Sequence, residues 1–275
     1  MASKKTLWRT LAATAAVLLA TTLAACSGSG VSGDTITAGK LTIGTGNPAY
    51  EPWVIGDDPA SGKGFEAAVA YAVAEKLGFK AADVVWVRTT FDEAIAPGQK
   101  NFDFNLQQYS ITDERKANVD FSSAYYETAQ VVVTVAGSPA ASAKSIADLK
   151  GYLLGAATGT TSYDAIGSVI NPTQKAQAFN SNDDAKAALT NGQVDAIVLD
   201  LPTALYASCC ELNGGKIVGQ LPTAAKGDQF GLVLDKGSKL TAAVTKAVDD
   251  LRADGTLAKL EAKWLTADAG IPVLK

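Results

Sequence analysis

The chain has 275 residues, with 24 Lys and Arg, 28 Asp and Glu, and no histidine. The lack of histidine excludes Ser-His and Cys-His nucleophilic catalysis and most zinc sites. The acidic balance argues against a nucleic-acid partner, and we expect no metal and no cofactor. Beyond its N-terminal segment the chain is long enough for two modest lobes.

Residues 1–25 have the pattern of a secretory signal peptide: three basic residues, an alanine-rich apolar run, and small residues at its end. The run is too short to be a convincing permanent membrane span. Removing it leaves 21 basic and 28 acidic side chains, a net charge of −7, because it holds three basic residues and no acid. LAAC, ending at Cys26, is similar to a bacterial lipobox, although ordinary cleavage or a membrane anchor are alternatives. We predict a lipoprotein signal peptide, lipidation of Cys26, and a flexible tether over 26–39.

The first strand, predicted over 41–44, leads into the loop TGNPAYEPW at 45–53. Gly and Pro favour a loop here. Its two large aromatics, Tyr50 and Trp53, stand near the carboxyl end of a strand, where ligands bind in open α/β sheets. We expect them to wall a binding cleft, with simple packing of the loop as the alternative.

A helix, a strand and a further helix start follow. Apolar residues recur at helical spacing over 65–77, just before Gly78, which suits a C-terminal cap. VVWV at 84–87 predicts the next strand, and FDEAI at 91–95 opens a short helix. Phe91 faces either a ligand or the core.

Residues 102–126, FDFNLQQYSITDERKANVDFSSAYY, carry the strongest functional signal. A short alternating strand over 102–106 ends in uncharged hydrogen-bonding groups, namely Gln107, Gln108, Tyr109 and Ser110. Arg115 follows a polar turn, and its rigid fork of donors pairs with a carboxylate in a way that Lys cannot copy. This arrangement suits capture of a small carboxylate, and a surface ion pair with Asp113 or Glu114 is the alternative.

SITDERKANVDFSSAYYETAQ, which begins at Ser110, closely resembles the SIT-x-E-R-x-x-x-V-D-F-S-x-x-Y-Y-x-S-G signature of the family 3 extracellular solute-binding proteins. These are the amino-acid receptors of ABC importers. The resemblance implies an α/β periplasmic-binding-protein fold of type II: two lobes, each a mixed sheet flanked by helices, joined by two hinge strands. Many members carry Asp directly after the Thr of the first strand, where this chain has Gly46-Asn47. A lysine or arginine ligand is therefore less expected, although Glu51 could substitute.

The second lobe is expected over 130–225, with a β-rich crossing at 128–135. SIADLKG at 145–151 is similar to the family's S-x-x-D-L-x-G and is followed by a strand, a turn and a helix. The free N–H groups of that helix start and the hydroxyls of Thr160 and Thr161 could bind a carboxylate, or merely cap the helix.

GQVDAIVLDLPTALY at 192–206 resembles the family pattern G-x-V-D-A-x-x-x-D-x-P-x-x-x-Y. Asp200 stands at the carboxyl end of a buried strand, where Asp before Leu-Pro is also an ordinary helix start. The resemblance implies that Asp200 holds the ligand's α-amino group. Cys209 and Cys210 can form a vicinal disulfide or remain thiols.

Residues 226–234 and 252–264 resemble the family's return strand and its closing D-G-T…K-W motif, so the resemblance covers nearly all of 40–266. It implies a first lobe made of residues 40–126 and 230–275.

The resemblance implies a monomeric, lipid-anchored receptor on the extracellular face of the bacterial cytoplasmic membrane. It would bind a small polar amino acid between the lobes and deliver it to the permease subunits of an ABC importer. In this assignment the α-carboxylate is held by Arg115 with Ser110, Thr160 and Thr161, the α-amino group by Asp200 and a neutral group near Gln108, and the side chain by Tyr50, Trp53 and Phe91.

Gln107 and Gln108 are large and polar where relatives have small residues, which favours a smaller or neutral polar ligand. Glutamine, other polar amino acids and cystine stay open. Two other functions remain: an enzyme resembling the cyclohexadienyl dehydratases, with Glu51 or Asp200 as the acid, and a sensory lipoprotein.

Overall fold

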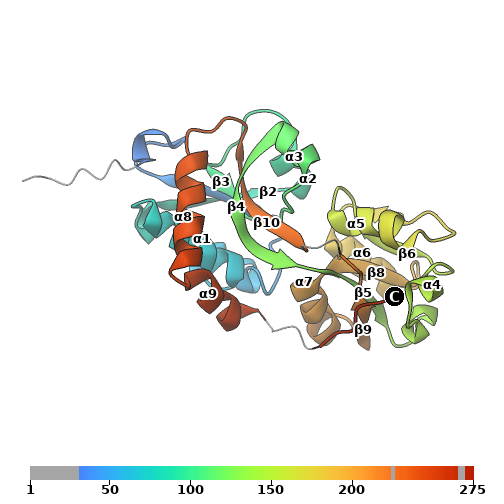
Figure 1. The fold of residues 1–275 in the computed structure, drawn as a ribbon. Helices are drawn as coiled ribbons and strands as arrows, with labels where there is room; N and C mark the ends of the chain where they lie inside the picture. Colours follow the sequence, from blue (N-terminus) through green and yellow to red (C-terminus); the bar gives the residue numbers. More distant parts are fainter. Residues whose placement is uncertain (1–30, 224–226, 266–269) are drawn as a thin grey trace, which may run out of the picture.

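A computed structural model describes residues 31–223, 227–265 and 270–275. It shows two α/β lobes that meet along one side (Figure 1). The predicted signal peptide and Cys26 lie outside the described residues. Among the described residues, no helix combines the length and the hydropathy needed to cross a membrane.

Lobe 1 is built on a mixed five-stranded sheet in the order β2-β1-β3-β10-β4. Its strands are β1 (Leu41–Gly46), β2 (Val84–Thr89), β3 (Phe104–Asn105), β4 (Val119–Thr128) and β10 (Asp228–Asp235). β1 pairs in parallel with β2 and β3, whereas β10 runs antiparallel to β3 and β4. Of the strand predicted over 102–106, only Phe104 and Asn105 pair with neighbouring strands.

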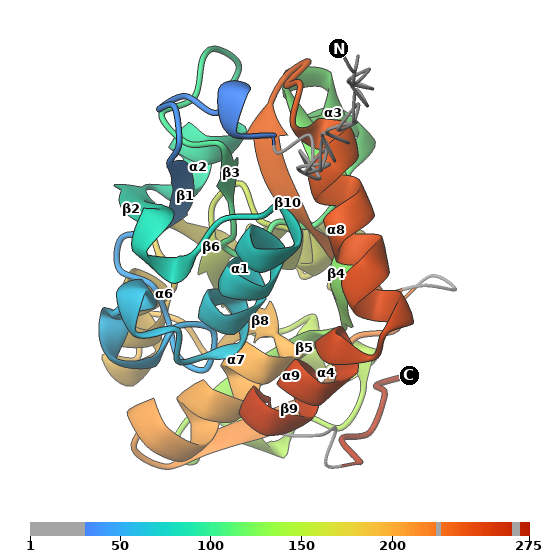
Figure 2. The same cartoon turned by 90° about the vertical axis from the view of Figure 1, so that its left-hand side faces the viewer.

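The helices of lobe 1 cover both faces of this sheet. They are α1 (Phe65–Lys76), α2 (Phe91–Ile95), α3 (Asp113–Asn118), α8 (Thr241–Ala253) and α9 (Thr256–Trp264). α8 runs along the lobe beside α1 (Figure 2). Their apolar faces and the sheet enclose a core that contains Phe65, Phe104 and Phe230. α1 can be apolar on most of its surface because it is packed on several sides.

Lobe 2 is a second mixed sheet in the order β7-β6-β8-β5-β9. Its strands are β5 (Gln130–Val135), β6 (Leu154–Ala157), β7 (Gln177–Phe179), β8 (Ala196–Asp200) and β9 (Gly215–Gln220), and its helices are α4 (Ile146–Leu149), α5 (Thr161–Ala165), α6 (Asn182–Thr190) and α7 (Leu201–Tyr206). Val132 faces one core and Val131 and Val133 face the other, because successive strand residues point to opposite faces. This explains the continuous apolar run of β5, an interior strand of the sheet.

Two strand segments form the hinge between the lobes. β4 passes into β5 at residues 128–130, as the β-rich run predicts, and β10 returns to lobe 1 from residue 228. Gly227 stands at this crossing with its α-carbon against β4, where an added Cβ would lie 2.1 Å from the carbonyl oxygen of Thr128. Only glycine allows the two hinge strands to approach so closely.

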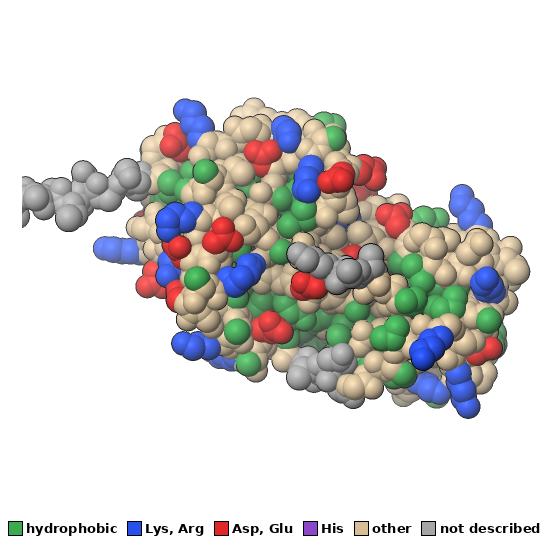
Figure 3. Space-filling view, in the orientation of Figure 1, with side chains coloured by type: hydrophobic (Ala, Val, Ile, Leu, Met, Phe, Trp, Pro, Cys, Tyr) green, Lys and Arg blue, Asp and Glu red, His purple; other side chains and the backbone are tan. Residues whose placement is uncertain are grey.

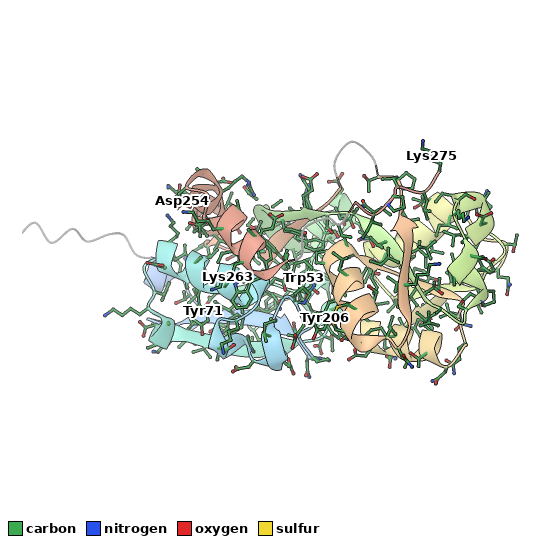
Figure 4. The ribbon with its side chains drawn as sticks, turned by 90° about the horizontal axis from the view of Figure 1, so that it is seen from below. Trp53, Tyr71, Tyr206, Asp254, Lys263 and Lys275 are labelled. Atoms are coloured by element: carbon green, nitrogen blue, oxygen red, sulfur yellow. A yellow bond between two sulfur atoms is a disulfide. The ribbon has the colours of Figure 1, made fainter. Side chains whose placement is uncertain are left out.

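Both ends of the described chain differ from the predicted boundaries. Residues 31–39, expected as part of a flexible tether, lie against lobe 1: Val31 packs on its core, and the N–H of Ile36 donates to Asp103. Residues 270–275, expected in lobe 1, return to lobe 2 (Figure 4), where Leu274 joins the core and Val273 bridges to β9. The short apolar IPVL segment fits the lobe 2 surface, and sequence periodicity gives no sign of its partner.

Cys209 and Cys210 form a vicinal disulfide in a π-helical turn that follows α7. This resolves the alternative that the sequence leaves open. On the face of lobe 1 seen in Figure 3, Lys and Arg side chains alternate with Asp and Glu, so that face carries no extended basic patch.

Candidate ligand-binding site

A cavity of about 130 Å³ lies between the lobes. Lobe 1 lines it with the loop after β1, the start of α2 and the segment between β3 and α3. Lobe 2 lines it with the starts of α5 and α6 and the end of β8. The lining residues include Tyr50, Phe91, Gln107, Gln108, Ser110, Arg115, Thr160, Thr161 and Asp200. Nine of the ten predicted ligand-binding residues therefore meet at one site.

Arg115 is 7% exposed, so the surface ion pair that was its alternative does not form. Asp113 pairs with Lys116 instead. The guanidinium donates from one terminal nitrogen to the carbonyl oxygen of Ser110 (2.7 Å) and from the other to that of Gly159 in lobe 2 (2.8 Å). Burial lowers the pKa of Arg115, but an arginine keeps its charge at any ordinary pH. The site therefore contains a fixed buried cation.

Asp200 ends β8 and does not cap α7 with its side chain. Its carboxylate accepts a hydrogen bond from Nε2 of Gln130 (2.9 Å). Burial, followed by the neighbouring charge of Asp228, raises its pKa to about 7. A cation placed beside Asp200 would stabilise the ionised carboxylate, so the geometry provides a site for an ammonium group.

Asp228 is the centre of a hydrogen-bond network at the hinge. Its Oδ2 accepts from Ser110 (3.2 Å), from Thr161 (2.5 Å) and from Gln130 (2.8 Å). Ser110 and Thr161 also contact each other directly across the cleft, with 3.1 Å between their hydroxyl oxygens. The network joins both lobes and both hinge strands directly below the cavity.

The two threonines of lobe 2 have different roles. Thr160 caps α5: its hydroxyl accepts from the N–H of Tyr163 and donates to the carbonyl of Ala157. Thr161 uses its hydroxyl at the hinge. α5 has five residues, so its macrodipole is small, and the donors that it offers are the first backbone N–H groups, which no helix satisfies internally.

Phe91 and Tyr50 border the cavity as predicted. The Phe91 ring lies 4.7 Å from that of Tyr109, and the Arg115 guanidinium stands 5.2 Å from the Phe91 ring centre, a cation–π arrangement that holds the arginine in place. Tyr50 reaches lobe 2, where Ser181 interacts with its hydroxyl and the Nζ of Lys186 lies 5.3 Å from its ring centre.

Trp53 does not wall the cavity. It is fully buried in the aromatic core of lobe 1, where its ring lies 5.7 to 6.0 Å from the rings of Phe65, Tyr126 and Phe230. The backbone explains this correction: the carbonyl of Trp53 accepts N–H groups at the start of α1, which turns the side chain inward. Its Nε1 donates to Thr203 of α7 (2.9 Å), at the lobe boundary seen in Figure 4.

Glu51 is also outside the residues that line the cavity. Its carboxylate accepts from the N–H of Gly56 and interacts with Tyr206 of lobe 2. It neither replaces the acidic residue that many relatives carry after the first strand nor serves as an acid in the cleft.

Sequence reasoning missed three groups: the buried Gln130, the buried Glu66, which accepts hydrogen bonds from Gln108, and the half-buried Asp228. Their contacts with the site join residues far apart in the chain: 42 positions separate Glu66 from Gln108, 70 separate Gln130 from Asp200, and 118 separate Asp228 from Ser110. The one available signal was that Gln130 and Asp228 both fall in the predicted hinge strands. Among the described residues, no cluster of acidic or sulfur ligands could hold a metal ion.

Residues 41–267 match the family model of the bacterial extracellular solute-binding proteins, family 3. The chain belongs to this family. It is 31% identical over 228 residues to the L-arginine-binding protein of Pseudomonas aeruginosa, covering 80% of this chain and 86% of that protein.

Solved structures of the family agree with the fold. An ancestral arginine-binding protein bound to glutamine matches with a TM-score of 0.69 and 35% identity, over 82% of this chain and 97% of that one. The ancestral amino acid-binding protein AncCDT-1, a precursor of cyclohexadienyl dehydratase, matches with a TM-score of 0.68 and 31% identity, over 83% and 96%. The two-lobed fold of type II is therefore confirmed.

Proposed function

We propose that this protein is a lipid-anchored receptor that binds one small, neutral polar amino acid between its lobes and delivers it to an ABC importer. The observation that carries the proposal is that Arg115, from lobe 1, and Asp200, from lobe 2, line the same small cavity. A buried cation and a half-buried carboxylate at one site match the two charged groups of an α-amino acid.

The α-carboxylate is assigned to Arg115, with help from the N–H groups at the start of α5. Arginine has five N–H donors, and two of its terminal ones are used for backbone carbonyls. The remaining donors can pair with a carboxylate. The α-ammonium group is assigned to Asp200 and to acceptors near Gln108. The relatives named for arginine and the solved complex with glutamine support an amino-acid ligand.

The rest of the lining favours a neutral polar side chain. It is formed largely by amides and hydroxyls, namely Asn47, Thr90, Gln107, Asn180, Ser181 and Asn182, and by the ring of Tyr50. Asp92 adds one carboxylate from α2. Such groups hydrogen-bond an amide or hydroxyl, and they offer little compensation for the desolvation of a guanidinium. We therefore expect glutamine and similar ligands to bind better than arginine.

The test is thermal unfolding of the chain that lacks its first 26 residues, measured against the twenty amino acids, cystine and ornithine. At a hundredfold excess over its Kd a ligand adds about 2.7 kcal/mol of stability, which raises the Tm of a protein of this size by roughly 5 to 10 °C. Arg115→Ala should abolish the shift, whereas Lys116→Ala, at its exposed neighbour on α3, should leave it intact. A flat panel would refute amino-acid binding.

The anchor is tested separately. The full chain expressed in a bacterium should partition with the membranes, and Cys26→Ser should release it. Mass spectrometry of the membrane form should show an acylated Cys26 at the mature N-terminus. A wild-type chain that stays in the soluble fraction would refute the anchor without affecting the ligand assignment.

An enzyme on the same fold is the second candidate. Its specific support is the pKa of about 7 for Asp200, which makes this carboxyl a proton donor near neutral pH, together with the likeness to the precursor of a dehydratase. Incubation with prephenate decides between the two functions. Turnover by the wild type that Asp200→Asn abolishes would establish the enzyme.

A further inference from the structure

Glu66 is a buried carboxylate below the cavity that the proposed function does not use. It stands at the second position of α1, is 2% exposed, and is outside the cavity lining. It accepts from the backbone N–H of Gln108 (2.8 Å), from the side-chain Nε2 of Gln108 (2.5 Å) and from the hydroxyl of Tyr125. Burying a carboxylate costs free energy even when three donors bond it. We therefore asked what the buried Glu66 does for the neighbouring cavity.

The two bonds from Gln108 fix both its backbone and its side chain. Gln108 has a φ of 52°, in the left-handed region that a residue with a side chain adopts at a cost of about 1 to 2 kcal/mol. The bond from its backbone N–H to Glu66 holds it there. The bond from Nε2 orients the amide so that nitrogen faces Glu66, which leaves the amide carbonyl oxygen, Oε1, as the acceptor available to the cavity.

The side-chain amide of the neighbouring Gln107 is oriented the other way round, with its oxygen rather than its nitrogen bonded to the protein. Oε1 of Gln107 accepts from the hydroxyl of Tyr109 (2.8 Å), so its amide nitrogen is the group left over. That nitrogen lies against the backbone of Gly46, where an added Cβ would approach it to 2.9 Å. The two glutamines therefore offer the cavity a donor, the amide nitrogen of Gln107, and an acceptor, Oε1 of Gln108. Asp200 lines the same cavity as Oε1 of Gln108 does.

We propose that Glu66 is a positioning residue for the ligand's α-ammonium group, acting through Gln108. Its carboxylate holds Gln108 in the left-handed conformation with Oε1 turned toward the cavity, where this oxygen and Asp200 together receive the ammonium group. The inference rests on the proposed function, because it requires a ligand with an α-amino group.

The charged groups around Glu66 agree with this role. Among the described residues, Tyr125 of β4 and Gln108 donate the three hydrogen bonds that Glu66 accepts. The ionisable groups that interact with it electrostatically are Tyr109, Tyr125 and Asp200. None of these is a cation. Burial raises the pKa of Glu66 to about 7, and the ligand's ammonium group would bring a positive charge beside Asp200 and Oε1 of Gln108.

The experiment is isothermal titration of the chain lacking residues 1–26 with two matched pairs of probes. One pair is L-glutamine and glutaramic acid, which is the same molecule without its α-amino group. The other pair is L-arginine and 5-guanidinopentanoic acid. The variants are Glu66→Gln, Gln108→Ala and the double variant. Glu75→Gln is the control, because Glu75 is an exposed glutamate at the far end of the same helix.

We expect Glu66→Gln to weaken binding of the L-amino acid about tenfold, the size of one hydrogen bond to a charged group, and to leave the des-amino probe unchanged. Glu66→Asp should recover part of the loss. The double variant should bind no more weakly than Gln108→Ala alone, because Glu66 acts only through Gln108. Circular dichroism and the Tm of each variant establish that it is folded at the titration temperature.

Equal losses for a probe and its des-amino counterpart, or fully additive losses in the double variant, would overturn the positioning role while leaving amino-acid binding intact. An unchanged affinity in Glu66→Gln would also overturn it. Failure of the wild type to bind any amino acid of the panel is a different result, since it refutes the proposed function and the inference with it.

Discussion

The affinity of this protein for an amino acid should fall as the pH is lowered, and Asp200 is the main reason. In the unliganded protein, burial and the nearby Asp228 raise the pKa of Asp200 to about 7. An ammonium group at this carboxyl binds the ionised form. Below pH 7 the free protein therefore has to lose a proton in order to bind, and affinity drops with each unit of pH.

The magnitude follows from the fraction of Asp200 that is ionised. With a pKa of about 7, this fraction falls from roughly 90% at about pH 8 to about 1% at about pH 5, which predicts a loss of affinity of about ninetyfold. Protonation of Glu66, whose pKa is also about 7, acts in the same direction. The ligand's own α-ammonium and carboxylate groups keep their charges over this interval.

Isothermal titration from about pH 8 to about pH 5, in buffers of different ionisation enthalpy, measures both the affinity and the number of protons released. Asp200→Asn should bind roughly tenfold or more weakly at the upper pH and show a much flatter pH profile. Asp113→Asn, at a fully exposed carboxylate of α3, is the matched control. A wild-type affinity that stays constant over this range would refute the assignment of Asp200 to the ammonium group.

Three further changes have defined expectations. Trp53→Phe removes the hydrogen bond to α7 and should lower the stability of the closed form by about 0.5 to 1.5 kcal/mol. Small-angle scattering in the presence of ligand should then show a smaller fraction of compact molecules. Gly227→Ala forces a Cβ to 2.1 Å from the carbonyl of Thr128 and should lower the Tm by at least several degrees. In urea denaturation, the unliganded protein should be more stable near pH 5 than near pH 8. Glu66 and Asp200 have pKa values raised to about 7 in the folded state. Between the pKa of the unfolded state and that of the folded state, the folded protein binds more protons and therefore loses stability as the pH rises.

The fold and most of the site could be predicted because their signals are local. Arg115, Ser110 and Asp200 fall inside contiguous motifs, and the order of those motifs along the chain defines the two lobes. The hinge crossing at 128–135 was likewise visible as a β-rich run, and the structure divides it into the end of β4 and the start of β5.

The residues that were missed or misplaced depend on long-range packing. Trp53 belongs to the core because the backbone beside it docks on α1, a contact that no local pattern encodes. Glu66 looked like an ordinary residue in the first turn of a helix, and its importance appears only when Gln108, 42 positions away, is brought against it. The clue that the sequence offered for Glu66 was a glutamate on the apolar side of the helix, close to Phe65 and Val69.

The hinge network explains how one set of side chains can both close the lobes and bind a ligand. The guanidinium of Arg115 bonds a carbonyl in each lobe, Ser110 and Gly159, and still has three of its five N–H groups for a carboxylate. Contact between the lobes is therefore kept when the ligand binds, and the ligand adds to it. Each hydrogen bond between the ligand and the protein is worth about 1 kcal/mol net. A ligand that makes several of these bonds only in the closed form can therefore shift the equilibrium between open and closed molecules by the few kcal/mol that a population switch requires. In the proposed function, this closed form is what the permease recognises, so its population would report the presence of an amino acid.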